Sequence, residues 1–160
     1  MLDDKTLVAF ISQEGINASL VYPGVPTPTV PEAARALGVA GEQIIKSLVF
    51  LADAVPLLVI AAGESRIDYK ALAEALELSR RKIKFASSDL ALDITGFEVG
   101  AMPPFGHKEK LPTLLDDHSL RHEELFAGGG TKSALLRISL KELERVTNAR
   151  RLGLTERTVS

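Results

Sequence analysis

An apolar run at residues 44–51 restricts the possible folds of this chain more than any other segment. If the run is a strand, its side chains alternate between faces, so Lys46 and Ser47 point in opposite directions. The other side chains are apolar on both faces, which is typical of a covered central strand. An ammonium group in such a strand loses hydration. Lys46 is therefore interpreted either as a functional cation or as a lysine that protects a strand edge from aggregation.

The size and composition of the chain favour one globular domain. Its 160 residues are 46% hydrophobic, and we expect a domain at residues 1–150 with a charged tail at residues 151–160. Because cysteine is absent, disulfides, thiolate metal sites and a cysteine nucleophile are excluded. A net charge of −2 argues against broad attraction to nucleic acid. Without a signal-like N-terminus or the roughly 20 apolar residues of a membrane span, we expect a cytoplasmic protein with no membrane contact.

Local patterns predict an α+β fold. Five helices are indicated by capping residues at Asp3, Thr29, Asp68, Ser88 and Ser139. Strands are expected at residues 16–22, 44–51, 55–62, 97–99, 111–115 and 134–138. A short turn separates the second and third of these strands, so we expect them to pair antiparallel. The predicted architecture is a mixed, curved, partly barrel-like sheet that is covered by helices.

Three motifs that suggest chemistry are rejected on spacing. Residues 128–133 read Gly-Gly-Gly-Thr-Lys-Ser, whereas a phosphate-binding P-loop has glycine directly before Lys-Ser and a helix after it. His118 and His122 do not follow a recognised metal-ligand spacing, so no metal or other cofactor is predicted. Ser47 adjoins Lys46 but would point to the opposite face of a strand, which argues against a serine–lysine pair.

Two glycine-containing loops remain as candidate binding elements. Residues 100–107 combine glycines, which allow a ligand to approach the backbone, with two adjacent prolines, which fix the shape of the loop. Residues 128–130 are three consecutive glycines. The alternative interpretation of the first loop is an ordinary turn between strands. Together with Lys46, the loops would supply positive charge and backbone donors that position an ester and stabilise charge on its oxygen.

A basic cluster at residues 80–84 also has two interpretations. Four of its five residues are Arg or Lys. As a strand, the cluster would place Lys82 and Lys84 on one face and Ile83 on the other. It is either a solvated strand face or a phosphate-binding patch.

The order and spacing of these segments resemble the YbaK/ProX family, the freestanding relatives of the editing domain inserted in bacterial prolyl-tRNA synthetases. The resemblance covers about residues 22–147. The matching segments are Thr-Val-Pro-Glu-Ala-Ala at 29–34 with Gly38, Ile-Ile-Lys-Ser-Leu-Val-Phe at 44–50, Arg-Ile-Asp-Tyr-Lys at 66–70, Thr-Gly-Phe-Glu-Val-Gly at 95–100, Pro-Phe-Gly at 104–106, the glycines at 128–130 and the helix at 139–147.

The resemblance implies a deacylase that hydrolyses the ester of mischarged tRNA, typically tRNA for proline carrying a small amino acid such as Ala or Cys. Its partners would be that tRNA and prolyl-tRNA synthetase. By this likeness, Lys46 is the catalytic lysine that holds the terminal nucleotide or the ester, and water or the neighbouring ribose hydroxyl attacks. The residues that the likeness assigns to substrate binding are Tyr22, Ser47, Gly100, Ala101, Met102, Pro103, Pro104, Gly106, His107, Gly128, Gly129 and Gly130.

One departure from the family pattern bears on the substrate. Ala127 and Ala134 stand where members that favour cysteinyl-tRNA carry Ser and Asp. An alanyl or another small acyl group therefore fits the pattern as well as a cysteinyl group does. Two alternatives to hydrolysis remain. One is a non-catalytic module that binds an aminoacyl ligand or a synthetase. The other is a general RNA-binding protein, which the pI of about 5.9 disfavours.

Overall fold

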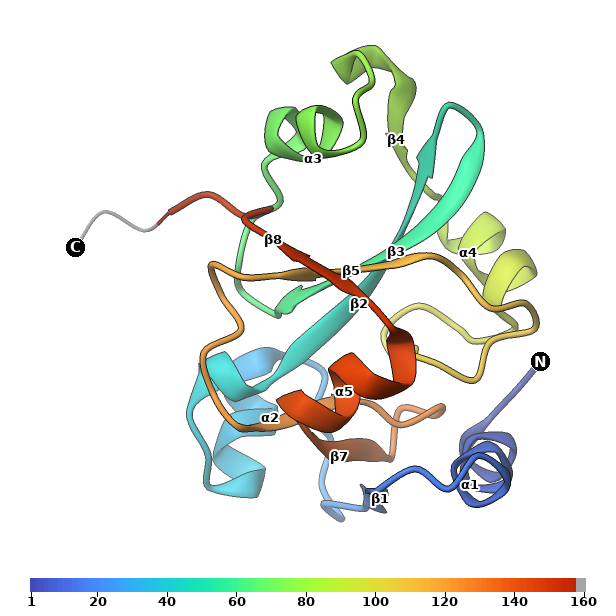
Figure 1. Ribbon diagram of the computed structural model, residues 1–160. Helices are drawn as coiled ribbons and strands as arrows, with labels where there is room; N and C mark the ends of the chain where they lie inside the picture. The colour runs from blue at the N-terminus through green and yellow to red at the C-terminus, as the bar shows by residue number, and fades with distance from the viewer. Residues whose placement is uncertain (158–160) are drawn as a thin grey trace.

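The computed structural model describes residues 1–157, which form two β-sheets with helices around them (Figure 1). The elements are, in chain order, α1 (Asp4–Gln13), β1 (Ala18–Val21), α2 (Val30–Leu37), β2 (Ile45–Ala52), β3 (Val55–Ala62), α3 (Tyr69–Ala75), β4 (Ile83–Phe85), α4 (Ser88–Thr95), β5 (Thr113–Asp116), β6 (Glu124–Gly128), β7 (Leu135–Ser139), α5 (Leu140–Thr147) and β8 (Arg150–Leu152). Short 3₁₀ turns precede β2 and β4.

The larger sheet has the strand order β4-β2-β3-β5-β8, and the smaller sheet has the order β1-β7-β6. The larger sheet is mixed, because β2 is antiparallel to both of its neighbours whereas β5 is parallel to β3 and β8. The α+β prediction with a mixed sheet is therefore confirmed, although the strands do not close into a barrel. Figure 1 shows α3 and β4 at one end of the molecule, and α1, β1 and β7 at the other.

The β2–β3 hairpin lies at the centre of the larger sheet. Every residue of β2 pairs with a residue of β3, which confirms the predicted antiparallel pair. The turn residues Asp53 and Ala54 both have positive φ angles, 49° and 67°, as in the tight turns that match the twist of the flanking strands. Because β2 lies between β3 and β4, it is an interior strand. The pairing with β4 covers only residues 50–52, so it does not decide between the two interpretations of Lys46, which lies outside that stretch.

Both faces of the hairpin are buried, as the apolar run predicted. Leu58 and Ile60 of β3 point into the larger core, which also contains residues of α1 and α4. Leu57 and Val59 point into the smaller core, which is closed by α3. All four side chains are at most 5% exposed. Burial on both faces explains why the strands are continuously apolar.

Most helix boundaries follow the predicted caps. The side chains of Thr29, Asp68 and Ser139 each accept a hydrogen bond from the backbone N–H three residues further on. For α4 the prediction was off by one residue, because Ser87 rather than Ser88 accepts the capping bond. Within the described range, none of the helices combines the length and apolar character needed to cross a membrane.

Three segments before the tail differ from the sequence prediction, and one of them is β6, which was not predicted as a strand. Residues 97–99 were predicted as a strand but form a turn, because Gly96 adopts a φ of 86° and ends α4 in the left-handed conformation. The basic cluster does not form one strand, since Arg80–Lys82 is a 3₁₀ turn and only Ile83–Phe85 pairs with β2. Lys82 and Lys84 are therefore not successive residues on one strand face.

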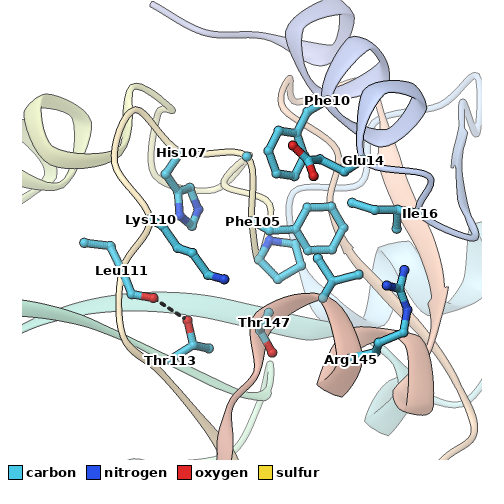
Figure 2. Close-up of a pocket in the computed structure, with 13 residues that line it drawn as sticks. Phe10, Glu14, Ile16, Phe105, His107, Lys110, Leu111, Thr113, Arg145 and Thr147 are labelled. Atoms are coloured by element: carbon cyan, nitrogen blue, oxygen red, sulfur yellow. Dashed lines mark hydrogen bonds between the residues drawn. The ribbon is translucent and has the colours of Figure 1, made fainter.

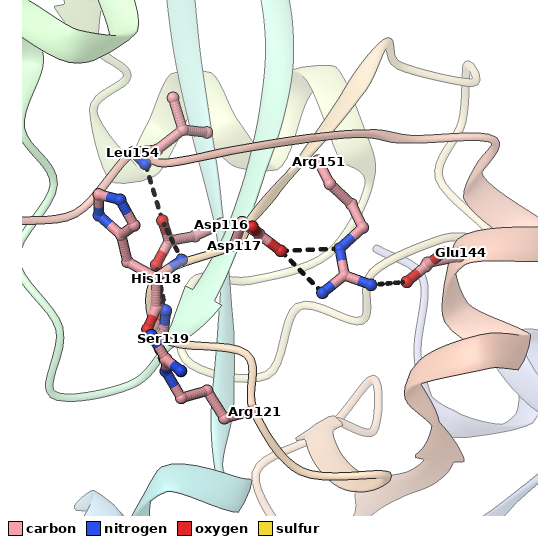
Figure 3. A network of polar contacts seen from close by, with 8 residues as sticks. All are labelled: Asp116, Asp117, His118, Ser119, Arg121, Glu144, Arg151 and Leu154. Atoms are coloured by element: carbon pink, nitrogen blue, oxygen red, sulfur yellow. Dashed lines mark hydrogen bonds and ion pairs between the residues drawn. The ribbon is translucent and has the colours of Figure 1, made fainter.

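The predicted charged tail is part of the fold as far as the structure describes it. Arg150–Leu152 forms β8 beside β5, and Leu154 is fully buried. The carboxylate of Asp116, at the end of β5, accepts a hydrogen bond from the backbone N–H of Leu154 at 2.8 Å (Figure 3) and another from that of Thr155 at 3.1 Å. This contact joins residues nearly forty positions apart, so no local sequence pattern predicts it. The last part of the predicted tail, residues 158–160, lies outside the described residues.

Asp116 is a fully buried carboxylate that holds three chain segments together. Its Oδ2 atom also accepts hydrogen bonds from the backbone N–H of Ser119 at 2.9 Å and from the hydroxyl of Thr155 at 2.7 Å. Burial by itself would raise the pKa of Asp116, but the hydrogen bonds from Ser119, Thr155 and Leu154 outweigh burial and lower this pKa. The carboxylate therefore stabilises the fold above its unfolded pKa, and this stability is lost as the pH falls through the lower folded pKa.

Replacing Asp116 with Asn tests this role. We expect Asp116→Asn to lower the free energy of unfolding by about 2–4 kcal/mol, because several buried donors lose a charged acceptor. Chemical denaturation at neutral pH measures the loss. Asp117→Asn is the matched control, since the Asp117 carboxylate forms an exposed ion pair with Arg151 at 2.8 Å, and we expect it to cost less than about 1 kcal/mol. Equal losses in the two variants would contradict the assignment.

Candidate functional site

Lys46 is the charged side chain of the central strand. It is half-buried and lies on the same face of β2 as Leu48 and Phe50. Its ammonium group donates a hydrogen bond to the backbone carbonyl oxygen of Ser65 at 2.7 Å. Burial lowers the pKa of Lys46, because desolvation disfavours the charged form. None of the ion pairs found in residues 1–157 includes Lys46, so two of its three N–H donors remain for a ligand.

An open hollow of about 780 Å³ lies in front of Lys46. Its floor is aromatic, because the ring centroid of Phe50 lies 5.5 Å from that of Tyr69 and 5.2 Å from that of Phe85. The guanidinium group of Arg80 lies over the ring of Tyr69, 4.2 Å from its centroid. The hollow therefore offers flat apolar surfaces next to positive charge. Its other lining residues are Leu48, Glu64, Ser65, Arg66, Ile67, Asp68 and Glu156.

The two glycine loops are in direct backbone contact. The N–H of Gly130 donates a hydrogen bond to the carbonyl oxygen of Ala101 at 2.8 Å. A β-carbon at Gly128 would lie 2.3 Å from the carbonyl oxygen of Met102, so only glycine permits this approach. Residues 101–105 are all buried. The loops therefore form one packed unit in which each fixes the position of the other.

The start of α1 and the end of β1 also contact this unit. Gly130 adopts a φ of 92°, and a β-carbon there would lie 2.7 Å from the carbonyl oxygen of Asp3. The hydroxyl of Tyr22 donates a hydrogen bond to the carboxylate of Asp4 at 2.7 Å. The N–H of Gly129 donates a hydrogen bond to the carbonyl oxygen of Ala134 at 3.2 Å. The structure thus brings Tyr22 and both glycine loops together around the first residues of α1.

The backbone at Lys46 lies near the glycine loops in space, but the Lys46 side chain and the loops are on different sides of β2. A parallel bridge between Ile44 and Phe126 places β6 beside the start of β2. Gly128, the last residue of β6, therefore lies near Lys46. Met102, however, packs in the larger core, whereas the hollow at Lys46 is on the side of the smaller core. No residue of either loop lines that hollow. The period of two along a strand is the physical reason for this separation.

Ser47 points to the side of the glycine loops. It follows Lys46 on β2 and shares its face with Ile45 and Val49, which pack in the same core as Met102. Its hydroxyl oxygen is buried and has no hydrogen-bond partner within the described residues. A buried hydroxyl without a partner is costly and calls for an explanation such as a ligand contact. Ser47, predicted from the sequence to bind substrate, is therefore placed apart from the ammonium group of Lys46.

The far end of the loop at residues 100–107 lines a separate cavity of about 290 Å³ (Figure 2). Three residues that the sequence assigned to substrate binding, Pro104, Gly106 and His107, are among its lining residues. His107 Nε2 donates a hydrogen bond to the carbonyl oxygen of Pro103 at 2.8 Å. Burial lowers the pKa of His107 despite this bond, so its ring is neutral at pH 7.

Sequence reasoning missed the other residues around this cavity. Phe105 belongs to the loop at residues 100–107, whereas the others come from α1 and the residues just after it, from residues 110–113 and from the end of α5, so only the tertiary fold brings them together. No spacing in the sequence signals them. These residues are Phe10, Glu14, Ile16, Phe105, Lys110, Leu111, Thr113, Arg145, Val146 and Thr147.

The two histidines considered as metal ligands have separate partners. His118 Nδ1 donates to the carbonyl oxygen of Thr155 at 2.8 Å. His122 Nε2 lies 3.3 Å from the carboxylate of Glu42. In the part of the chain that the structure describes, no three side chains converge in the manner of a metal site. The two imidazoles therefore do not share a ligand position.

The fold and the site together define a class of protein. It is a mixed α+β domain in which the half-buried Lys46 lies beside an aromatic hollow. The two glycine loops pack against each other at the end of β6, the strand beside the start of β2. The sequence profile of the aminoacyl-tRNA editing domain matches residues 25–146, and the chain belongs to this family. The resemblance drawn from the sequence segments is therefore confirmed.

Individual relatives agree with this assignment. The chain is 31% identical to the uncharacterised protein YwhH of Bacillus subtilis over 116 residues, which is 72% of each chain. It is also 31% identical to the proline–tRNA ligase of Thermodesulfovibrio yellowstonii over 115 residues, which is 69% of this chain but only 19% of the ligase. A solved structure, provisionally described as a trans-editing enzyme for prolyl tRNA synthetase, matches with a TM-score of 0.87 and 32% identity over 96% of both chains.

A methyl group at Gly128 tests the close packing of the two loops. Gly128→Ala is expected to lower the free energy of unfolding by about 1–3 kcal/mol, because the β-carbon would meet the backbone of Met102 and the loops must separate. Gly41→Ala is the control, because the nearest atom to its β-carbon is 3.6 Å away. Denaturant titration of both variants measures the difference. If Gly128→Ala were as stable as Gly41→Ala, the described packing would be wrong.

Proposed function

We propose that this protein is a trans-editing deacylase that hydrolyses the ester of mischarged tRNA, in the cytoplasm and in association with prolyl-tRNA synthetase. The observation that carries the proposal is the half-buried Lys46 ammonium group, which has no carboxylate partner among the described residues and faces an open hollow. Membership of the editing-domain family and the similarity to proline–tRNA ligase support the choice of substrate class.

Lys46 would act by positioning the substrate. One of its N–H donors is used by Ser65, and the other two are available to a phosphate or ester oxygen at the end of the tRNA. A cation that is already desolvated interacts strongly with an anion and with charge that develops in the transition state. Water would attack the ester carbonyl directly, or the neighbouring ribose hydroxyl would attack first, which moves the acyl group to that oxygen and leaves a new ester for water to cleave. Net hydrolysis adds water across the ester and releases a free amino acid and the tRNA hydroxyl.

The hollow beside Lys46 suits an unpaired RNA end. Phe85 is 53% exposed, an unusual state for a large aromatic side chain, and it lies against Phe50. Arg80 covers the ring of Tyr69 from the same hollow. Proteins bind single-stranded nucleotides by stacking bases on aromatic and guanidinium planes and by pairing phosphates with cations. Three cations, Lys46, Arg66 and Arg80, line the hollow together with three carboxylates, Glu64, Asp68 and Glu156, so the cations act there as individual contacts and not as a basic patch.

The favoured acyl group is small and apolar. Ala127 and Ala134 are both buried and add no polar group beside the glycine loops. Without a hydroxyl or a carboxylate at these two positions, residues 127 and 134 offer no side-chain partner for a thiol, and the hydroxyl on this side of β2 is that of Ser47. Within the proposed substrate class, tRNA for proline carrying alanine is therefore preferred over the cysteinyl form.

A non-catalytic binding module is the second candidate. It is favoured by one observation, that no residue of the glycine loops lines the hollow at Lys46. A ligand could then be held at Lys46 without its ester reaching the loops. This module would bind an aminoacyl ligand or a synthetase saturably and would cleave no aminoacyl-tRNA.

Deacylation assays on a panel of aminoacyl-tRNAs test the proposal. Wild-type protein is expected to hydrolyse alanyl-tRNA for proline faster than the cysteinyl form, and to spare prolyl-tRNA. Lys46→Ala is expected to lower the rate by about 10²-fold or more, because the substrate loses its positioning charge. Lys70→Ala, on the exposed surface of α3, is the control and should leave the rate unchanged. The thermal unfolding of each variant shows whether it is folded.

Two results would contradict the proposal. Unchanged turnover in folded Lys46→Ala would remove the assigned role of the lysine. Saturable binding without cleavage of any aminoacyl-tRNA would favour the non-catalytic module instead.

A further inference from the structure

The cavity at the far end of the loop of residues 100–107 has an apolar body. The rings of Phe10 and Phe105 are stacked, with centroids 5.9 Å apart and planes inclined by 28°. Ile16 and Val146 extend this surface, and all four side chains line the cavity (Figure 2). A volume of about 290 Å³ suits a small molecule rather than a nucleic-acid end.

Among the described residues that line the cavity, one cation and one anion are left without a charged partner. Arg145 donates two hydrogen bonds of 2.7 Å to Glu142, so these two charges neutralise each other. His107 is a neutral ring at pH 7, because burial lowers its pKa. Lys110 and Glu14 are the remaining charged residues that line the cavity, and neither forms an ion pair within residues 1–157.

These two charges come from different walls. Lys110 lies in the segment before β5 and extends its ammonium group toward the cavity (Figure 2). Glu14 is the C-cap residue of α1 and lines the cavity from that side. Both residues are exposed, so their charges lie at the mouth of the cavity, whereas Phe10 and Phe105 form its apolar body. A free α-amino acid carries its ammonium and carboxylate on one carbon, so the two charges at the mouth would hold that pair while the side chain enters the apolar body.

We infer that this cavity binds a free apolar amino acid, with its carboxylate at Lys110, its ammonium group at Glu14 and its side chain against Phe10 and Phe105. The inference goes beyond the proposed function, which concerns an amino acid esterified to tRNA. An ester has no free carboxylate for Lys110. The cavity is also separate from the hollow at Lys46, since the two have no lining residue in common.

Calorimetric or NMR titration of the full chain tests this site without any tRNA. The probes are L-alanine, L-proline, L-valine and L-leucine, followed by the amide and the N-acetyl derivative of the tightest ligand. We expect saturable binding of the free amino acid and at least about 10-fold weaker binding of each derivative, because each lacks one charge. In Lys110→Met the free acid and the amide should bind equally, and in Glu14→Gln the free amine and the N-acetyl derivative should bind equally.

Lys108→Met is the matched control. The ammonium group of Lys108 contacts the carbonyl oxygen of Asp93 at 3.3 Å, and Lys108 does not line the cavity, so binding should not change. The inference is overturned if no probe binds saturably to the wild-type chain, or if the amide binds as tightly as the free acid. Deacylation is assayed on tRNA without added amino acid, whereas this titration contains no tRNA. A protein that fails to deacylate tRNA can still bind the free amino acid, and a protein that fails to bind the free amino acid can still deacylate tRNA.

Discussion

The alternation of side chains along β2 determines where each part of the candidate site lies. The strand pairs with β3 over its whole length and is covered on both faces, so it has little freedom to shift its register. Lys46 must therefore project on the side of Phe50 and the smaller core. Ser47 must project toward the larger core and the glycine loops. A shift of one residue would exchange the two and bury the ammonium group.

This placement gives Lys46 an electrostatic character that its residue type alone does not provide. Desolvation lowers its pKa, and the single hydrogen bond to Ser65 offsets part of the cost of burying the charge. A cation held in this state interacts more strongly with a phosphate or an ester oxygen than a fully hydrated lysine does. The aromatic floor formed by Phe50, Tyr69 and Phe85 adds contacts for a base. Charge and stacking are thus offered within one hollow.

Features that depend on neighbouring residues could be predicted from the sequence, and features that depend on distant ones could not. Caps such as Thr29 and Ser139 act over three residues, and both were predicted correctly. The tail strand β8 was missed because it is held by Asp116, whose bonds to Leu154 and Thr155 have no local signal. The strand predicted at residues 97–99 failed because Gly96 turns the chain.

The candidate site shows the same division. Lys46 and the glycine loops could be singled out as candidates from the sequence, because a charge in an apolar run and clustered glycines are local signals. The acceptor of the hydrogen bond from the Lys46 ammonium group, the carbonyl oxygen of Ser65, is nineteen residues away and was not predicted. Nor was the cavity that joins α1 to α5, since Phe10 and Val146 meet only in the folded chain.

The most direct test of the account is an NMR titration of ¹³Cε-labelled lysine with a non-hydrolysable alanyl-adenosine amide that carries a 5′ phosphate. The Lys46 resonance is assigned by its loss in Lys46→Arg. Our account predicts that this resonance shifts as the analogue saturates the protein, and that the pKa of Lys46 rises because a bound anion favours its charged form. Saturation of the protein with no change in the Lys46 resonance or its pKa would contradict the account.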